Sequence, residues 1–281
     1  MKTYLVPVDF SETSVHAAEF AASLSAQTGV NHIILLNSYY VSVYESILPT
    51  PDLILPTPEE IEERTAERKA KLESLKTKLL ADGALDLIID TMVSRLPLLR
   101  AVLETIETEQ TDLVMLGSNG NKSTEDSHVG ANVVSIAKNS PVPVIVVPPA
   151  CCYKPVKRIV MACDFKKVNE AVPLESLKRI LDRYKVDLLV VNVDPDDKKC
   201  DDPKVKAEEV TLHQMLNQYH PQYHYVCNKD VINGITRFAA DHDAQLVIAL
   251  PHRYSFLQSL IHSSVSEKLT VHSSVPVLLL K

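Results

Sequence analysis

Three glycines that follow a short apolar run are the residues of this chain best suited to bind a phosphate group. The run is Leu113–Leu116, and Gly117, Gly120 and Gly130 follow it with two and then nine residues between them. Glycine permits tight turns and lets a ligand approach the backbone closely. A helix that begins after Gly130 would direct its free N–H groups at an anion. The spacing predicts a phosphate-binding loop, although glycines near a strand end are also common in ordinary loops.

Asp9 is the carboxylate best placed to face this loop. It follows the apolar run Tyr4–Val8, which we predict to be a buried strand. Ligands of open α/β sheets lie beyond the carboxyl ends of the strands, so Asp9 and the glycine loop would share one rim. An aspartate after a strand can instead cap the next helix. Because Ser11 or Thr13 can also fill that cap, a ligand contact from Asp9 is the favoured hypothesis.

The elements that would position these residues alternate between short β-branched runs and amphipathic helical patterns, which predicts parallel βαβ units. We expect strands at 4–8, 32–37, 87–93, 113–116 and 142–147. We expect helices from Ser11 or Thr13 to about Gln27, and at 59–81, 98–109 and 131–138. The same order of elements recurs from Arg158 to Leu280.

The recurrence is an internal repeat. Asp9 and Asp164 lie 155 positions apart, and so do the asparagines of the second strands. The offset has fallen to 133 at the fourth strand, as for Val114 and Val247, and it stays at 133 for Pro143 and Pro276. The first copy therefore holds about 22 extra residues between its second and fourth strands. We assign them to the proline-rich stretch 40–60, which we expect to form a long ordered loop or flap.

The predicted helix 59–81 is dense in charge. Pairs of opposite sign three or four residues apart recur along it: Glu60 with Arg64, Glu67 with Lys71, and Glu73 with Lys76. Such pairs lie within reach of one another on a helix. The pattern is typical of a solvated face.

The whole pattern resembles the universal stress protein family. The residues that carry the resemblance are VPVDFSE around Asp9, LLNS ending at Ser38, the glycine spacing, and PVPVIVVPP at the close of the first copy. The resemblance covers nearly the whole chain as two tandem domains. It implies an α/β fold in which each domain is Rossmann-like (adenine nucleotide alpha-hydrolase-like), with a five-stranded parallel sheet and helices on both faces. It also implies binding of ATP, with or without Mg²⁺, where the glycine motif is complete.

The resemblance assigns ligand contacts in the first copy. Asp9 and the backbone at Ser38 would hold adenine and ribose. The phosphates would be held along the loop by Leu116, Gly117, Gly120, Gly130, Ala131 and Asn132. The family pattern has Ser or Thr where Ala131 stands here. Loss of that hydrogen bond, about 1–3 kcal/mol to a charged oxygen, would weaken phosphate binding without removing the backbone cradle.

The second copy departs further from the pattern. Its glycine positions are occupied by Leu250, Arg253 and Ser263, although Ser264 supplies the hydroxyl that the first copy lacks. Asp164 remains as the acid after the first strand. We interpret this copy as a degenerate, structural partner. The alternative is a site for a different anion at Arg253, His252 or Lys166.

Residues 148–152 are interpreted as the linker, so we predict domain 1 at 1–149 and domain 2 at 153–281. The last strand of each copy, Val144–Val147 and Val277–Leu280, would leave an apolar sheet edge, and such an edge is a pairing surface. The resemblance implies dimers through this strand. In a tandem chain the two copies can pair with each other, and further pairing between chains would give a homodimer.

Composition excludes several other classes. Apolar content of 46% and charged content of 23% are those of a soluble globular protein, and a net charge of −7 argues against nucleic acid as a partner. Asp9 interrupts the N-terminal apolar run, so we expect no signal peptide, and no apolar run is long enough for a membrane helix. Five cysteines without CxxC spacing favour a reducing cytoplasm.

Seven of the ten histidines lie in the second copy, but we expect no metal site. Pro221 stands between His220 and His224, and a strand at 223–228 would point His224 and Cys227 to opposite faces. Surface histidines are the simpler interpretation. Cys163, at a strand end, is expected to be partly exposed, which would allow a redox role.

Three functional hypotheses remain. The first is a cytoplasmic universal stress protein that binds ATP in domain 1 and acts in regulation or stress protection, with no catalytic residues. The second is slow ATP hydrolysis or phosphoryl transfer at the same site, with Asp9, Glu125 and Asp126 as candidate metal ligands. The third is a structural or partner-binding stress protein without nucleotide.

Overall fold

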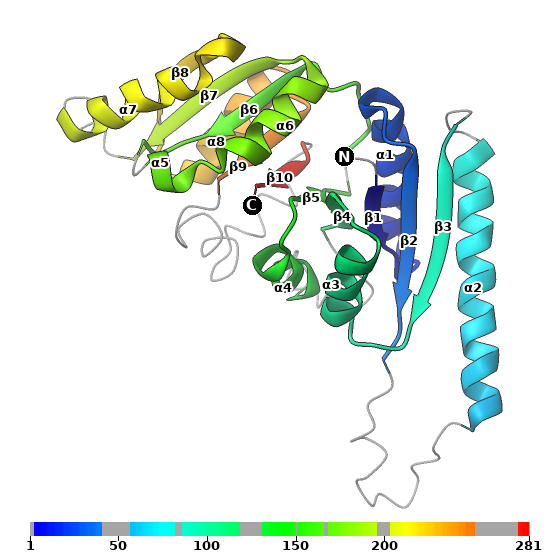
Figure 1. The fold of residues 1–281 in the computed structure, drawn as a ribbon. Helices are drawn as coiled ribbons and strands as arrows, with labels where there is room; N and C mark the ends of the chain where they lie inside the picture. Colours follow the sequence, from blue (N-terminus) through cyan, green and yellow to red (C-terminus); the bar gives the residue numbers. More distant parts are fainter. Residues whose placement is uncertain are drawn as a thin grey trace, which may run out of the picture.

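The computed structural model describes residues 3–40, 57–81, 86–118, 131–149, 151–165, 168–195, 203–250 and 275–280. The elements of the first copy alternate between strand and helix (Figure 1). They are β1 (Thr3–Pro7), α1 (Glu12–Thr28), β2 (His32–Ser38), α2 (Pro58–Ala81), β3 (Ile88–Ser94), α3 (Leu98–Thr108), β4 (Leu113–Gly117), α4 (Ala131–Asn139) and β5 (Val144–Val147). All lie within two residues of the expected bounds.

The second copy repeats the order, with shorter helices after its first two strands. Its elements are β6 (Arg158–Ala162), α5 (Val168–Ala171), α6 (Leu174–Tyr184), β7 (Asp187–Asp194), α7 (Pro203–Leu216), the 3-10 helix η2 (Asn217–Tyr219), β8 (Gln222–Cys227), α8 (Val231–Asp241), β9 (Leu246–Ala249) and β10 (Val277–Leu279). One difference from the first copy lies after β6. The single helix α1 is represented there by α5 and α6, and Pro173 stands between them, where a proline interrupts the helical hydrogen bonds.

The two copies share one ten-stranded sheet of order β3-β2-β1-β4-β5-β10-β9-β6-β7-β8. The strands of each copy are parallel to one another, and the copies meet where β10 pairs antiparallel with β5. In this join Leu278 lies opposite Ile145, and both side chains are buried. The two last strands thus cover each other's apolar edges, and the expected intrachain pairing is confirmed.

Helices cover both faces of the sheet, because successive side chains of a buried strand point to opposite sides. Tyr4 packs with α1 and α2 on one face, whereas Leu5 packs with α3 and α4 on the other. The core under α1 and α2 continues into the second copy, where it includes Leu177 of α6 and Leu212 of α7. The other face has two clusters, and the one under α3 and α4 also includes Ala249 and Leu279 of the second copy.

Gln27, near the end of α1, ties the start of the second copy to the first. Its Nε2 donates to the Val156 carbonyl at 2.6 Å, and its Oε1 accepts from the Val156 amide at 2.7 Å. The Tyr153 hydroxyl donates to the same oxygen at 3.0 Å, and its ring packs edge-on against Phe20. The segment that leads from one copy to the other is therefore held by specific bonds.

Most of the extra length of the first copy lies between its second and third strands. Asn37 of β2 pairs with Val93, and the matching Asn192 of β7 pairs with Tyr225, which is much closer in sequence. The expected flap falls largely on residues 41–56, outside the described residues. The flap does not hold all of the extra length, because part of it belongs to a longer helix: α2 has 24 residues and α7 only 14. The longer helix lies alongside β3 at the edge of the sheet (Figure 1).

Candidate functional site

Asp9 lies just beyond the carboxyl end of β1, with an exposed side chain. Its Oδ1 accepts from the Ser11 amide at 3.0 Å and from the Ser11 hydroxyl at 2.5 Å. Ser11 is the N-cap of α1, and its side chain accepts from the amide of Ser14. Ser11 therefore fills the cap, as one of the two expected residues, and the carboxylate of Asp9 is oriented by the capped turn.

Phe10 makes the turn from β1 into α1 with a positive φ of 65°. Phe165 does the same after β6, 155 positions later, with a φ of 49°. A positive φ costs a non-glycine residue on the order of 1–3 kcal/mol of conformational free energy. Packing of the surrounding residues must offset this cost. Phe10 is only partly buried, whereas Phe165 is 2% exposed.

Asn37 connects the ends of the first two strands. Its Nδ2 donates to the carbonyl of Val8 at 2.6 Å, and Asn192 makes the matching bond to Cys163 at 2.8 Å. The Oδ1 of Asn37 accepts a hydrogen bond from the guanidinium of Arg68 at 3.1 Å. From the sequence alone, Asn37 serves only to measure the repeat. The identical offset to Asn192 was the signal that could have marked it as part of the rim.

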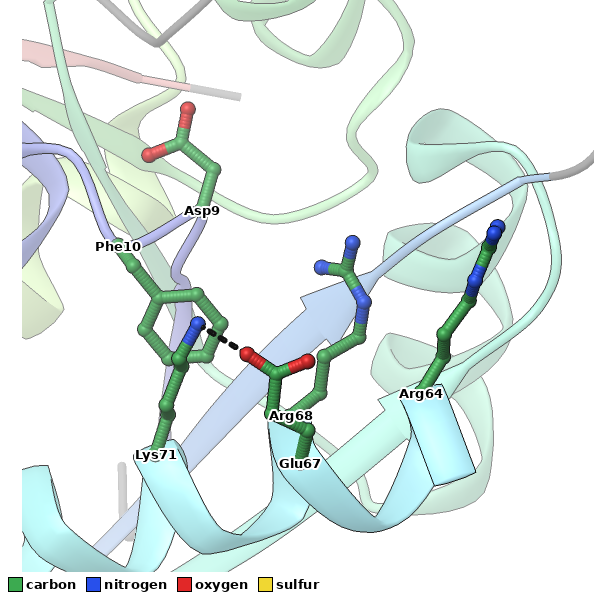
Figure 2. A pocket seen from close by; sticks show the side chains of 6 residues that line it. All are labelled: Asp9, Phe10, Arg64, Glu67, Arg68 and Lys71. Carbon is green, nitrogen blue, oxygen red and sulfur yellow. Dashed lines mark ion pairs between the residues drawn. The ribbon is translucent and has the colours of Figure 1, made fainter. Parts of the chain in front are cut away.

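A cleft of about 450 Å³ opens beside Asp9. Asp9 and Phe10 line it from the end of β1, and α2 contributes Arg64, Glu67, Arg68 and Lys71 (Figure 2). The predicted pair of Glu67 and Lys71 forms, with 2.6 Å between Oε1 and Nζ, and the ammonium lowers the pKa of the Glu67 carboxyl. The charged face of α2 is therefore not only a solvated face, because part of it forms one wall of the cleft.

Gly117 ends β4 and lies against the first turn of α1. A Cβ atom on Gly117 would lie 2.5 Å from the carbonyl oxygen of Thr13. The sequence predicts a glycine here for the close approach of a ligand. The structure adds a packing reason, because α1 can begin here only if residue 117 has no side chain. Leu116 is buried in the core under α3 and α4, so only its backbone is available to a ligand.

The remaining predicted contacts are distributed around the same rim. Ser38 ends β2, and its hydroxyl donates to the Leu96 carbonyl at 2.7 Å, which leaves the predicted backbone contact untested. Ala131 is the first residue of α4, and Asn132 in the same turn is exposed. Gly120 and Gly130 lie outside the described residues. All these assignments therefore stay predictions.

Comparison with known proteins identifies the relatives of this chain. The model of the universal stress protein family matches residues 1–148 and again residues 155–281. The chain belongs to the universal stress protein family. The double match agrees with the tandem arrangement inferred from the repeat.

Solved structures show the same fold for this universal stress protein. One from Archaeoglobus fulgidus is 18% identical, with a TM-score of 0.67, and the alignment covers 99% of this chain and 96% of that one. A functionally unknown protein from Pseudomonas aeruginosa is 16% identical, with a TM-score of 0.58 and coverages of 100% and 92%. A universal stress protein solved in complex with cAMP is 20% identical, with a TM-score of 0.38 and coverages of 52% and 95%. At these identities the likeness to the first two structures shows the fold alone. A search of curated proteins found no match.

In the second universal stress protein domain, the residues that correspond to Phe10 and Gly117 are Phe165 and Leu250, and both belong to or pack against the hydrophobic core. Phe165 packs on the ring of Tyr225 with 6.0 Å between centroids. Leu250, at the position of Gly117, packs against the core. The expectation that Cys163 is partly exposed is wrong: its side chain is buried, and burial raises the pKa of the thiol to about 12. A neutral, buried thiol is a poor nucleophile, because the thiolate is the reactive form.

Other parts of the rim of this domain lie outside the described residues, among them Lys166, His252, Arg253, Ser263 and Ser264. The alternative anion site assigned to some of them stays a prediction. Within the described part of the chain, no helix is both long and apolar enough to cross a membrane.

Proposed function

We propose that this universal stress protein is a cytoplasmic protein that binds ATP, or another adenine nucleotide, at the rim of its first copy. The observation that carries the proposal is the position of Asp9 and Gly117 on neighbouring strands. β1 lies between β2 and β4, and the chain continues from β1 to β2 before crossing back to β4. Parallel sheets bind ligands at such a reversal of strand order, outside the carboxyl ends of the strands.

The chemistry of the rim suits a nucleotide. The exposed carboxylate of Asp9 can accept hydrogen bonds from ribose hydroxyls or from an amino group. Gly117 begins the glycine-rich segment on the other side of β1, and the backbone there would bind phosphate oxygens. The predicted contacts at Ser38, Ala131 and Asn132 lie around the same reversal. Any Mg²⁺ bound with ATP would take oxygen ligands chiefly from the phosphates and water.

The difference between the copies supports a single nucleotide site. The first copy has a cleft beside Asp9, whereas the corresponding residues of the second copy, Phe165 and Leu250, are part of or packed against the hydrophobic core. The second copy also completes the sheet by pairing β10 with β5. Its role would be structural, and nucleotide binding would act through conformation or a partner in regulation or stress protection.

The test is to purify the full chain without added nucleotide, denature it and analyse the released small molecules. Recovery of ATP or ADP, together with a rise in melting temperature when ATP is added, is the expected result. Asp9→Asn should reduce the thermal shift, and Gly120→Leu should abolish it by placing a bulky side chain in the loop. Asp164→Asn is the matched control, since it makes the same change at the repeated position of the second copy.

The outcomes separate the hypotheses. Absence of released nucleotide and of any thermal shift would exclude nucleotide binding and favour a structural or partner-binding protein. An equal loss of the shift in the Asp9→Asn and Asp164→Asn variants would place the site elsewhere. If ATP binds, a time course of phosphate release distinguishes a binding protein from a slow ATPase.

A further inference from the structure

The wall that α2 contributes to the cleft concentrates positive charge in an acidic protein. Three cationic side chains, Arg64, Arg68 and Lys71, line it, although the chain carries a net charge of −7. They recur at intervals of four and three residues, so they lie on one face of the helix. In Figure 2 the three side chains rise from α2 on the side where Asp9 and Phe10 lie.

Two of these cations are not neutralised within the described part of the chain. Lys71 pairs with Glu67, and the Oδ1 of Asp9 is bound by Ser11. Neither Arg64 nor Arg68 forms an ion pair with a described carboxylate. A guanidinium that lines a cleft without a carboxylate partner can accept an anion from solution.

Arg68 is held in place before any ligand arrives. Asn37 accepts from its guanidinium, and the group also lies 4.6 Å from the centre of the Tyr39 ring. Tyr39 is fixed in turn, because its hydroxyl contacts the Ile61 carbonyl at 3.1 Å and the Thr65 hydroxyl at 2.8 Å. An arginine that is already ordered loses less conformational entropy on binding, and its planar fork matches a phosphate.

In the order of the strands, the cationic side chains of α2 and the segment that begins at Gly117 lie on opposite sides of β1. Arg68 contacts Asn37 of β2, whereas Gly117 ends β4, and β1 with Asp9 lies between those strands. A ligand that contacts Asp9 and extends both ways would meet cations on the β2 side and backbone amides on the β4 side. Both surroundings favour negative charge.

We propose that the α2 wall is a second phosphate subsite, built around Arg64 and Arg68 and distinct from the glycine loop. The ligand of the first copy would then be an adenine nucleotide with phosphate groups on two sides of its ribose, such as adenosine 3′,5′-bisphosphate. This proposal rests on the proposed nucleotide binding for the identity of the base. It also gives a function to the greater length of α2, which the second copy lacks.

The experiment compares two ligands by calorimetry on the full chain: AMP and adenosine 3′,5′-bisphosphate, which carries a second phosphate on the other side of the ribose. The wild-type chain should bind the bisphosphate about tenfold more tightly than AMP. Arg64→Gln and Arg68→Gln should each reduce that preference while leaving the affinity for AMP within about twofold. Lys69→Gln is the matched control, because it removes one positive charge from α2 at a residue outside the cleft lining. Arg68→Lys keeps the charge without the fork and should retain part of the preference.

Two results would overturn the subsite. One is a wild-type chain that does not prefer the bisphosphate to AMP; the other is an equal effect of Arg68→Gln and Lys69→Gln. If neither AMP nor the bisphosphate binds, the proposed nucleotide function fails, and inorganic pyrophosphate then tests the subsite alone. Pyrophosphate binding that weakens in both arginine variants supports the subsite, and absent or unchanged binding rejects it. Melting temperatures of the variants show whether any loss comes from unfolding.

Discussion

Gly117 and Thr13 are packed backbone to backbone, where the end of β4 meets the first turn of α1. A Cβ on Gly117 would lie 2.5 Å from the Thr13 carbonyl oxygen, 2.7 Å from its carbonyl carbon and 3.1 Å from the Ser14 amide nitrogen. All three atoms belong to the backbone, so no side-chain rotation can relieve the overlap. The start of α1 and the end of β4 must separate if residue 117 gains even a methyl group.

We therefore expect Gly117→Ala to destabilise the protein by about 1–3 kcal/mol, as overpacking of a closely packed interior does. Denaturant unfolding measures the loss. Hydrogen exchange locates it, because amides in the first turns of α1 should exchange faster while those of α8 in the second copy serve as an internal reference. A variant as stable as the wild type, with unchanged exchange in α1, would contradict the packing role of this glycine.

Gln27 provides a second prediction, which concerns the junction of the copies. Gln27→Ala leaves the amide and the carbonyl of Val156 without their partner, and each buried polar group left unpaired costs about 1–3 kcal/mol. We expect a loss of stability of that order in denaturant unfolding. Gln214→Ala, an exposed glutamine on α7, is the control and should change stability little. Equal effects of the two substitutions would show that the bonds of Gln27 do not stabilise the junction.

The pairing of β5 with β10 leads to a third prediction, about self-association. A chain that ends after residue 149 lacks β10 and exposes the edge of β5, and an unpaired apolar edge is a template for another strand. We expect this fragment to form dimers or larger species in sedimentation. Val146→Lys in the same fragment should shift it toward monomer, because charge on an edge blocks pairing. A fragment that stays monomeric without that substitution would mean that β10 is not needed to cover the edge.

His224 leads to a fourth prediction, on pH. Its Nε2 is buried without a hydrogen-bond partner among the described residues, and its ring lies 5.3 Å from that of His242. Burial, and then the nearby His242, lower the pKa of His224. Because the unfolded state binds this proton more readily, the stability contribution is complete above the unfolded pKa of about 6.5 and falls as the pH drops through the folded value.

His224→Gln should therefore flatten the fall in unfolding free energy between about pH 7 and pH 5. Unfolding in denaturant at a series of pH values measures the slope. His220→Gln is the control, because His220 is exposed, and it should keep the wild-type slope. A His224→Gln variant with an unchanged slope would indicate that other groups produce the acid sensitivity.

The sequence by itself determined the repeat, the α/β class and the rim. Buried parallel strands are short apolar runs, and helices have their own period, so Leu113–Leu116 and the helix 98–109 could be placed within two residues. The rule that ligands lie at the carboxyl ends of parallel strands then brought Asp9 and Gly117 to one edge. These inferences use local pattern and topology, which a linear chain displays directly.

Only the tertiary structure decided which side chains meet. The contacts of Arg68 with Asn37 and Tyr39, and of Gly117 with Thr13, join residues far apart in sequence or depend on how a helix packs on the sheet. The charge pattern of α2 predicted a solvated face, because the spacing of charges alone does not show that Arg64, Arg68 and Lys71 border a cleft. Likewise, apolar edges at β5 and β10 allowed pairing within or between chains, and the three-dimensional packing of the two copies selected pairing within one chain.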